Sequence, residues 1–121
     1  MKRIRKERVE EIGLDLSKLS EDHIYRIAEI TEQSIREAID EVLRDRVIKY
    51  LLMVEVNIDD KLNVIVDLAV DSRVPPFISL ESVVDRAIKR GLDRAAAYIR
   101  RIARELSQQN SSDATSTRFS A

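Results

Sequence analysis

The chain has 121 residues, a length that fits one domain with a single small core. Apolar residues make up 44% of it and charged residues 36%, which is typical of a folded protein with a heavily charged surface. The formal net charge of -1 excludes the global basic field of a dedicated nucleic-acid binder. The lack of cysteine excludes disulfides, thiolate metal sites and thiol catalysis.

Targeting signals are not recognisable in the sequence. No apolar run reaches the length of a membrane span, and the N-terminus has no apolar core of the kind that signal peptides carry. We therefore expect a cytoplasmic protein that does not contact membranes. The chain has only two glycines, and arginine outnumbers lysine, which together favour a thermophilic source.

Residues 1–18 form a charged N-terminal segment, in which a mostly basic run from Lys2 to Arg8 precedes acidic residues. A solvated, fraying terminus is the simpler interpretation. The alternative is an arm that binds nucleic acid, but Glu10 and Glu11 directly after the basic run weaken it. We therefore place the folded domain at residues 19–107.

The first predicted element of this domain is a long helix that begins after Ser20. The Ser20 hydroxyl can accept a backbone N–H, and Glu21 and Asp22 lie favourably at the positive end of the helix dipole. Apolar residues then recur at intervals of three and four as far as Leu43, which lays one apolar stripe along the helix. The opposite face is net acidic.

Two β-strands are predicted next, from Leu51 to Ile58 and from Leu62 to Asp71. Apolar residues occupy every even position on both sides of a polar break at 59–61, so the pair forms a hairpin with one apolar face. A lone hairpin is unstable in water, so its face needs a cover and its edges need protection. The odd-numbered face carries four candidates for partner contact: Leu51, Met53, Ile65 and Ala69.

Pro75 and Pro76 delay the second helix, which is predicted from Ser79 to Leu106 with Ser79 as its N-cap. Gly91 lies within the apolar stripe of this helix, where it indicates the close approach of another backbone. The polar tail over residues 108–121 has little to bury and is predicted to be disordered.

The predicted fold is therefore α+β in the order αββα. Both long helices pack on one face of the antiparallel β-hairpin. We expect dimerisation to extend the sheet, because the hairpin leaves its strand edges open.

Residues that carry chemistry are scarce. His23 is the only histidine, and a structural or solvated role in the first helical turn explains it. The acidic residues are interleaved with arginines and no glycine-rich loop is present, so the sequence supports neither a metal site nor a cofactor. Ser79 and Ser82 have no base that the sequence places beside them. We therefore expect no enzymatic activity.

The second helix carries a basic face opposite its apolar stripe, which we call the basic ridge. A segregated stripe of this kind is able to follow a phosphate backbone, whereas the plainer interpretation is a solvated helix surface. Aromatic residues are only 4% of the chain, so base stacking has no support. The ridge consists of Arg86, Lys89, Arg90, Arg94, Arg100, Arg101 and Arg104.

The string that begins Asp15-Leu16-Ser17-Lys18-Leu19-Ser20 and runs to Arg104 resembles a small archaeal family known as a domain of unknown function. The likeness lies in the capped entry at Ser20, the strand pair, and the second helix with its run Ala95-Ala96-Ala97-Tyr98-Ile99. The same layout is similar to the small dimerising subunit of KEOPS, which installs threonylcarbamoyl on adenosine 37 of tRNA, and to its archaeal paralogue, a fifth subunit. This resemblance covers about residues 19–106.

The resemblance implies a non-catalytic subunit that pairs with itself or with a paralogous small subunit, caps the assembly and helps to shape the tRNA-binding surface. It also implies a strand before the first helix, where residues 1–18 show only a brief alternation. Two alternatives are an RNA-binding module that uses the basic ridge, and a homodimeric protein of another role. The partners expected are thus a second copy or a paralogue, with KEOPS subunits and tRNA.

Overall fold

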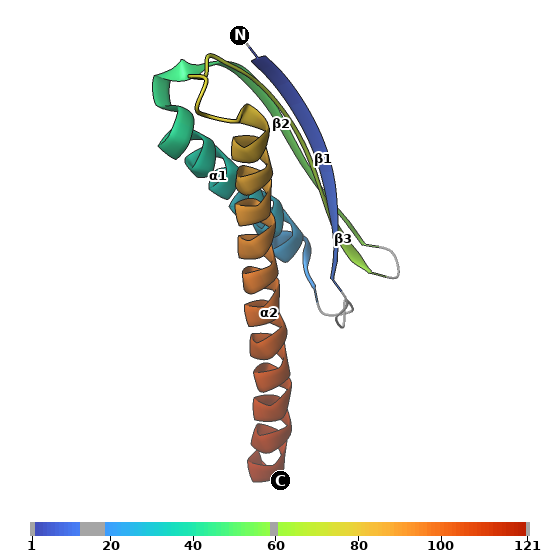
Figure 1. Ribbon diagram of the computed structural model, residues 1–121. Helices are drawn as coiled ribbons and strands as arrows, with labels where there is room; N and C mark the ends of the chain where they lie inside the picture. The colour runs from blue at the N-terminus through green and yellow to red at the C-terminus, as the bar shows by residue number, and fades with distance from the viewer. Residues whose placement is uncertain (1, 13–18, 59–60, 121) are drawn as a thin grey trace.

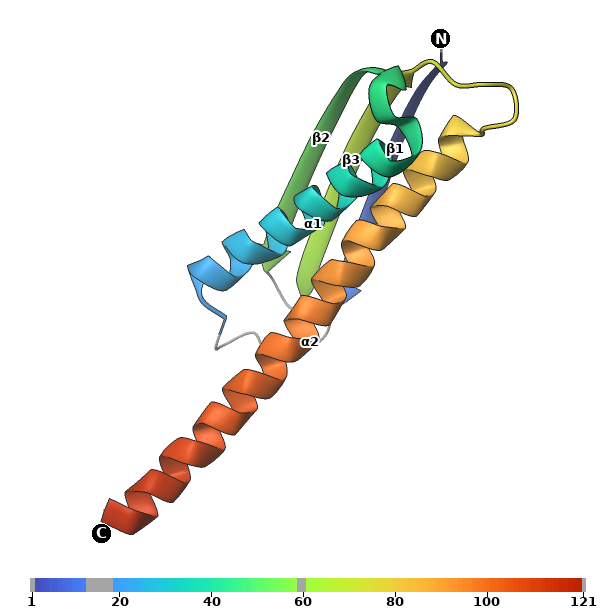
Figure 2. The same cartoon turned by 90° about the vertical axis from the view of Figure 1, so that its left-hand side faces the viewer.

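The computed structural model describes residues 2–12, 19–58 and 61–120. A three-stranded antiparallel sheet in the order β1-β3-β2 carries both helices on one face (Figures 1 and 2). This arrangement confirms the predicted α+β class. The elements in chain order are β1 (Lys2–Ile12), α1 (Glu21–Leu43), the 3-10 turn η2 (Arg44–Arg46), β2 (Val47–Ile58), β3 (Leu62–Ser72) and α2 (Leu80–Ser120).

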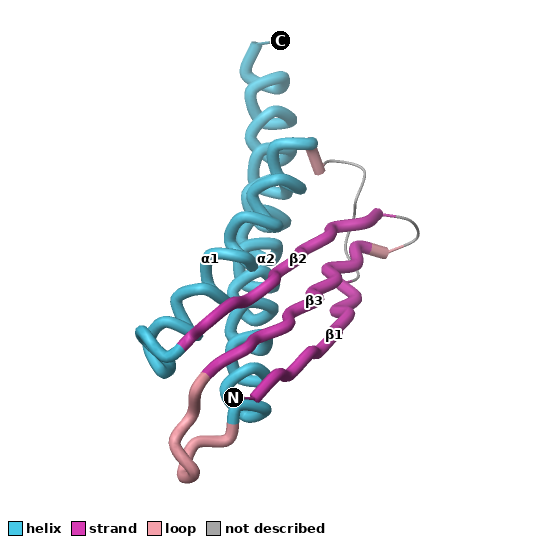
Figure 3. The backbone as a smooth tube through the Cα atoms, turned by 90° about the horizontal axis from the view of Figure 1, so that it is seen from above, coloured by secondary structure: helices cyan, strands magenta, loops and turns pink. Residues whose placement is uncertain are grey.

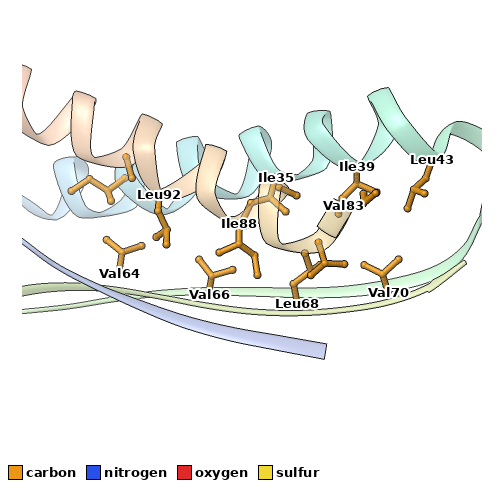
Figure 4. Packing of buried hydrophobic residues seen from close by; sticks show 14 of the residues in the cluster. Ile35, Ile39, Leu43, Val64, Val66, Leu68, Val70, Val83, Ile88 and Leu92 are labelled. Atoms are coloured by element: carbon orange, nitrogen blue, oxygen red, sulfur yellow. The ribbon is translucent and has the colours of Figure 1, made fainter. Parts of the chain in front are cut away.

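The core lies between the sheet and the two helices. On β3 the even-numbered side chains from Leu62 to Val70 are all 0% exposed, as the alternation predicts. They meet the apolar stripes of α1 and α2, which Figure 4 shows as Ile35 and Ile39 from one helix and Ile88 from the other. The corresponding face of β2 is only half-buried, because β2 lies at an edge of the sheet.

The N-terminal segment was predicted to be a fraying terminus, and for residues 2–12 that prediction is wrong. These residues form β1, which pairs with β3 in antiparallel register from Lys2 opposite Ser72 to Ile12 opposite Leu62. Ion pairs hold much of this strand, since Arg3 and Arg5 face aspartates of β3, and Ile4 adds a partly buried apolar contact with the core. A hydrophobic period cannot reveal a strand that is held in this way. The rest of the segment, residue 1 and residues 13–18, lies outside the described residues.

The hairpin between β2 and β3 is confirmed, with β2 starting at Val47 rather than Leu51. A register irregularity between Val47 and Lys49 bends the start of the strand. Of the polar break predicted at 59–61, residues 59–60 lie outside the described residues. Because β1 occupies the second side of β3, the hairpin leaves only one of its own strands, β2, at an edge.

The tail was predicted to be disordered, but α2 continues without interruption to Ser120 and extends past the end of the sheet (Figure 2). The chain has neither glycine nor proline after Gly91, so no residue forces the backbone out of the helix. Polar composition alone therefore did not end the helix.

The predicted N-caps of both helices and the close approach at Gly91 are confirmed. The His23 backbone N–H donates to the Ser20 hydroxyl over 3.2 Å, and that of Ser82 donates to the Ser79 hydroxyl over 3.2 Å. A Cβ on Gly91 would lie 2.6 Å from Ile35 Cγ1 and 3.0 Å from the backbone oxygen of Thr31. The predicted backbone approach is thus that of α1.

Candidate interaction surfaces

The outer face of the sheet, opposite the helices, carries the predicted partner contacts. Leu51 and Met53 of β2 are each 57% exposed there. They border a shallow hollow of about 580 Å³ whose other lining residues are Arg3, Arg5, Leu52, Asp67 and Ala69. Three of the four predicted contact residues therefore come together. Ile65 is also on this face but lies opposite Val9 in the register, nearer the hairpin turn.

Charged pairs alternate with these apolar side chains. The Arg5 guanidinium donates two hydrogen bonds to Asp67, at 3.1 Å from Nε and 2.7 Å from Nη2. This bidentate pair holds the pKa of the Asp67 carboxyl below its ordinary value. Arg3 Nε lies 3.5 Å from the Asp71 carboxylate in the next pair along the strand. The outer face is thus stabilised by local ion pairs and leaves its larger apolar groups open.

The two edges of the sheet are β1 and β2 (Figure 3), and they differ in charge. β1 has the sequence KRIRKERVEEI, in which eight of eleven residues are charged. Its inward-facing Lys6 donates a 2.7 Å hydrogen bond to Glu81 of α2, which raises the pKa of Lys6 and lowers the pKa of Glu81. β2 has the sequence VIKYLLMVEVNI, with two charged residues in twelve. Charged edges resist strand addition, whereas long apolar edges invite it.

The basic ridge lies on α2, on the side away from the sheet. All its members are exposed apart from Arg90, which is half-buried. Arg90 Nη1 is 3.0 Å from the Glu41 carboxylate, and Arg94 Nη1 is 3.0 Å from that of Glu37. Part of the ridge therefore joins α2 to the acidic face of α1.

The remaining ridge residues are of two kinds. Lys89 and Arg101 reach acids one turn along their own helix, at 3.4 Å to Asp93 and 3.8 Å to Glu105. Arg86, Arg100 and Arg104 make no ion pair with any side chain that the structure describes. The side chains of these three arginines are exposed to solvent.

Candidates for catalysis and metal binding are not assembled into a site. The Ser20 backbone N–H donates to His23 Nδ1 over 3.1 Å, so the histidine completes a capping box. Within residues 2–12, 19–58 and 61–120, no three acidic or histidine side chains gather as metal ligands would. Over the same ranges, no helix has both the length and the apolar character needed to cross a bilayer.

Sequence reasoning missed several exposed apolar residues: Val42 and Ile58 were expected on buried faces but are exposed, and Tyr25, Ile48, Phe77 and Val9 were not singled out. Phe77 is 84% exposed and lines a groove of about 540 Å³ between α1 and α2, together with Val42 and Ile78. Val9 is 52% exposed on β1, and it was hidden because β1 was not predicted.

Comparison with known proteins supports the fold. No protein-family model matches the chain, and no curated protein matches it. A crystal structure from Thermococcus onnurineus NA1 is similar over 84% of this chain and 98% of that one, with a TM-score of 0.64 and 24% sequence identity. At this identity the likeness establishes the α+β architecture and carries no function.

Proposed function

We propose that this chain is a non-catalytic assembly subunit that pairs with a second copy of itself, or with a related small subunit, along β2. The observation that carries the proposal is the contrast between the two sheet edges. β2 is a long, apolar edge with unpaired backbone groups on its outer side, and β1 is charged along its length.

Antiparallel pairing of β2 with a second β2 would satisfy those backbone groups and form a six-stranded sheet. A two-fold axis through the new strand pair places equivalent residues of the two copies close together. Leu51 and Met53, each 57% exposed, would then pack against their counterparts as cross-strand pairs. Ala69 lies beside Leu51 in the register and continues the apolar surface inward.

We propose further that the assembly is a tRNA-modifying complex of the KEOPS type, with this chain as its small dimerising subunit or that subunit's archaeal paralogue. The proposal rests on the resemblance over residues 19–106. The presence of β1 supports it, because the resemblance implies a strand before the first helix. In such a complex the chain would cap the assembly and help to shape the tRNA-binding surface.

Light scattering tests this role with the purified chain, alone and mixed with the paralogous small subunit from the same source. Pairing predicts either twice the 13.9 kDa of one chain or a clean shift to a one-to-one heterodimer in the mixture. A homodimer that ignores the paralogue would undercut the KEOPS assignment. A monomer under both conditions would overturn the pairing itself.

A variant pair locates the interface. Leu51→Lys with Met53→Lys sets like charges opposite each other across the two-fold axis and should abolish association. Val9→Lys is the matched control, because Val9 is a similarly exposed apolar residue on the outer face of the other edge strand. Association lost equally in the control would show that β2 is not the pairing edge.

A further inference from the structure

We propose that the basic ridge of α2 binds the phosphate backbone of RNA without regard to base sequence. Every basic residue between Leu80 and Leu106 belongs to this ridge, although the whole chain has a net charge of -1. The ridge is carried by α2, which packs over β1 and β3, whereas α1 packs over β2. This inference therefore stands whether or not β2 pairs with a partner.

The ion pairs divide the ridge into three groups: residues paired with α1, residues paired within α2, and residues with no acidic partner among the described side chains. Arg90 and Arg94 form ion pairs with Glu41 and Glu37 of α1, and these pairs hold the two helices together. Arg94 also lies 3.4 Å from the Ser34 hydroxyl. We assign RNA contact mainly to Arg86, Arg100 and Arg104, which are exposed and have no acidic partner among the described side chains.

The spacing of these arginines suits a phosphate chain. Arg100 and Arg104 lie one helical turn apart, ~6 Å along the axis, comparable with the separation of neighbouring phosphates on one strand. Arg86 lies on the same side of the helix, ~21 Å before Arg100. Between them the surface dips into a shallow trough that includes Ala97, whose small side chain lets a backbone approach.

The composition of the ridge favours a nucleic acid over an acidic protein. Protein interfaces contain a fully buried apolar core with aromatic anchors. The trough is lined by Arg86, Lys89, Arg90, Asp93, Arg94 and Ala97, a set that contains no large apolar side chain. Tyr98, the aromatic nearest the ridge, has the Arg101 guanidinium 5.3 Å from its ring centre. Within the trough, contact would thus be electrostatic, because no aromatic side chain of the described residues lines it.

The test is the salt dependence of RNA binding by the full chain, measured by fluorescence anisotropy with an end-labelled RNA hairpin. Each phosphate contact adds nearly one unit to the slope of log K against log salt. The variant Arg86→Gln, Arg100→Gln, Arg104→Gln should therefore lose about 2 to 3 units of that slope. A slope equal to that of the unsubstituted protein would overturn the assignment.

Two controls sharpen the test. Arg36→Gln, Arg46→Gln, Arg73→Gln removes the same charge from exposed arginines off the ridge and should leave the slope unchanged. Arg90→Gln should lower the unfolding midpoint, because it breaks a contact between helices, but should change the slope by less than the triple variant. A larger change of slope in Arg90→Gln than in the triple variant would overturn the assignment of RNA contact to Arg86, Arg100 and Arg104.

Three other outcomes would defeat the proposal: no RNA binding by the unsubstituted chain at low salt, equal loss in the off-ridge variant, or equal competition by polyglutamate. Light scattering on the ridge variant separates this inference from the proposed pairing. Its mass should match that of the unsubstituted chain, because the arginines lie away from β2.

Discussion

The two faces of the sheet obey different rules. On the inner face, β3 presents a row of side chains with no exposed surface, all of them aliphatic from Leu62 to Val70. On the outer face, ion pairs between β1 and β3 lie beside two apolar residues of β2 that remain more than half exposed, Leu51 and Met53. Burial of the inner face therefore stabilises the fold, and the apolar residues of the outer face remain available for an interface.

The inner face should be the more sensitive to charge. Val66→Asp places an unpaired carboxylate where the side chain is 0% exposed and should cost on the order of 5 kcal/mol, comparable with the whole stability of a small domain. Val54→Asp, on half-buried β2, should cost clearly less. Urea unfolding followed by circular dichroism measures both variants. Equal costs would mean that β2 is covered in solution.

The helical cover of the inner face should resist added volume. Gly91→Ala gains about 1 kcal/mol of helix propensity but drives a methyl group against Ile35 and the Thr31 carbonyl. Overpacking of this kind costs about 1 to 3 kcal/mol, so we expect a net loss of up to ~2 kcal/mol. The change in thermal midpoint gives the sign, and a stabilised variant would contradict the close approach of α1.

Substitutions on the outer face should have little effect on the stability of a single chain but should weaken the association of two chains. Leu51→Ser with Met53→Ser should change the stability of a single chain by less than about 1 kcal/mol. If β2 pairs, the melting temperature of the unsubstituted protein rises with concentration and that of the variant does not. Scanning calorimetry at several concentrations makes the comparison. Parallel concentration dependence in both proteins would place the interface elsewhere.

The smallest effect concerns the ion pair on the outer face. Because the folded pKa of Asp67 is lowered, its contribution is complete above the unfolded pKa of about 4 and disappears as the pH falls through the folded value. Asp67→Asn should cost up to ~1 kcal/mol at neutral pH and nearly nothing at strongly acidic pH. Urea unfolding at both pH values tests this. Asp71→Asn, which breaks the longer 3.5 Å contact, should cost less.

The sequence predicted the elements whose signals are local. Both helix starts follow from serines beside apolar periods, and the hairpin follows from its strict alternation. β1 could not be found in this way, because its partners are Asp67 and Asp71 of β3 and Glu81 of α2, far along the chain. The length of α2 was missed because polar residues continue a helix when nothing breaks it.

The candidate surfaces were predicted unevenly for the same reason. The exposure of Leu51 and Met53 follows from the alternation of the strand, because odd-numbered side chains point away from the core. The sequence does not reveal which ridge arginines form ion pairs. Glu37 and Glu41 meet Arg94 and Arg90 only after α1 packs against α2. Contacts between segments that are far apart in the sequence arise only when the chain packs, so the pattern of a single segment does not predict them.

The order of the strands also sets a sequence of events during folding. β3 meets β2 through a short hairpin, which forms quickly, but it meets β1 only when residues some seventy positions apart come together, as Lys2 and Ser72 do. We expect β1 to dock late. Until it does, an apolar strand lies open to other chains, and the charged N-terminal strand then acts as a gatekeeper against aggregation.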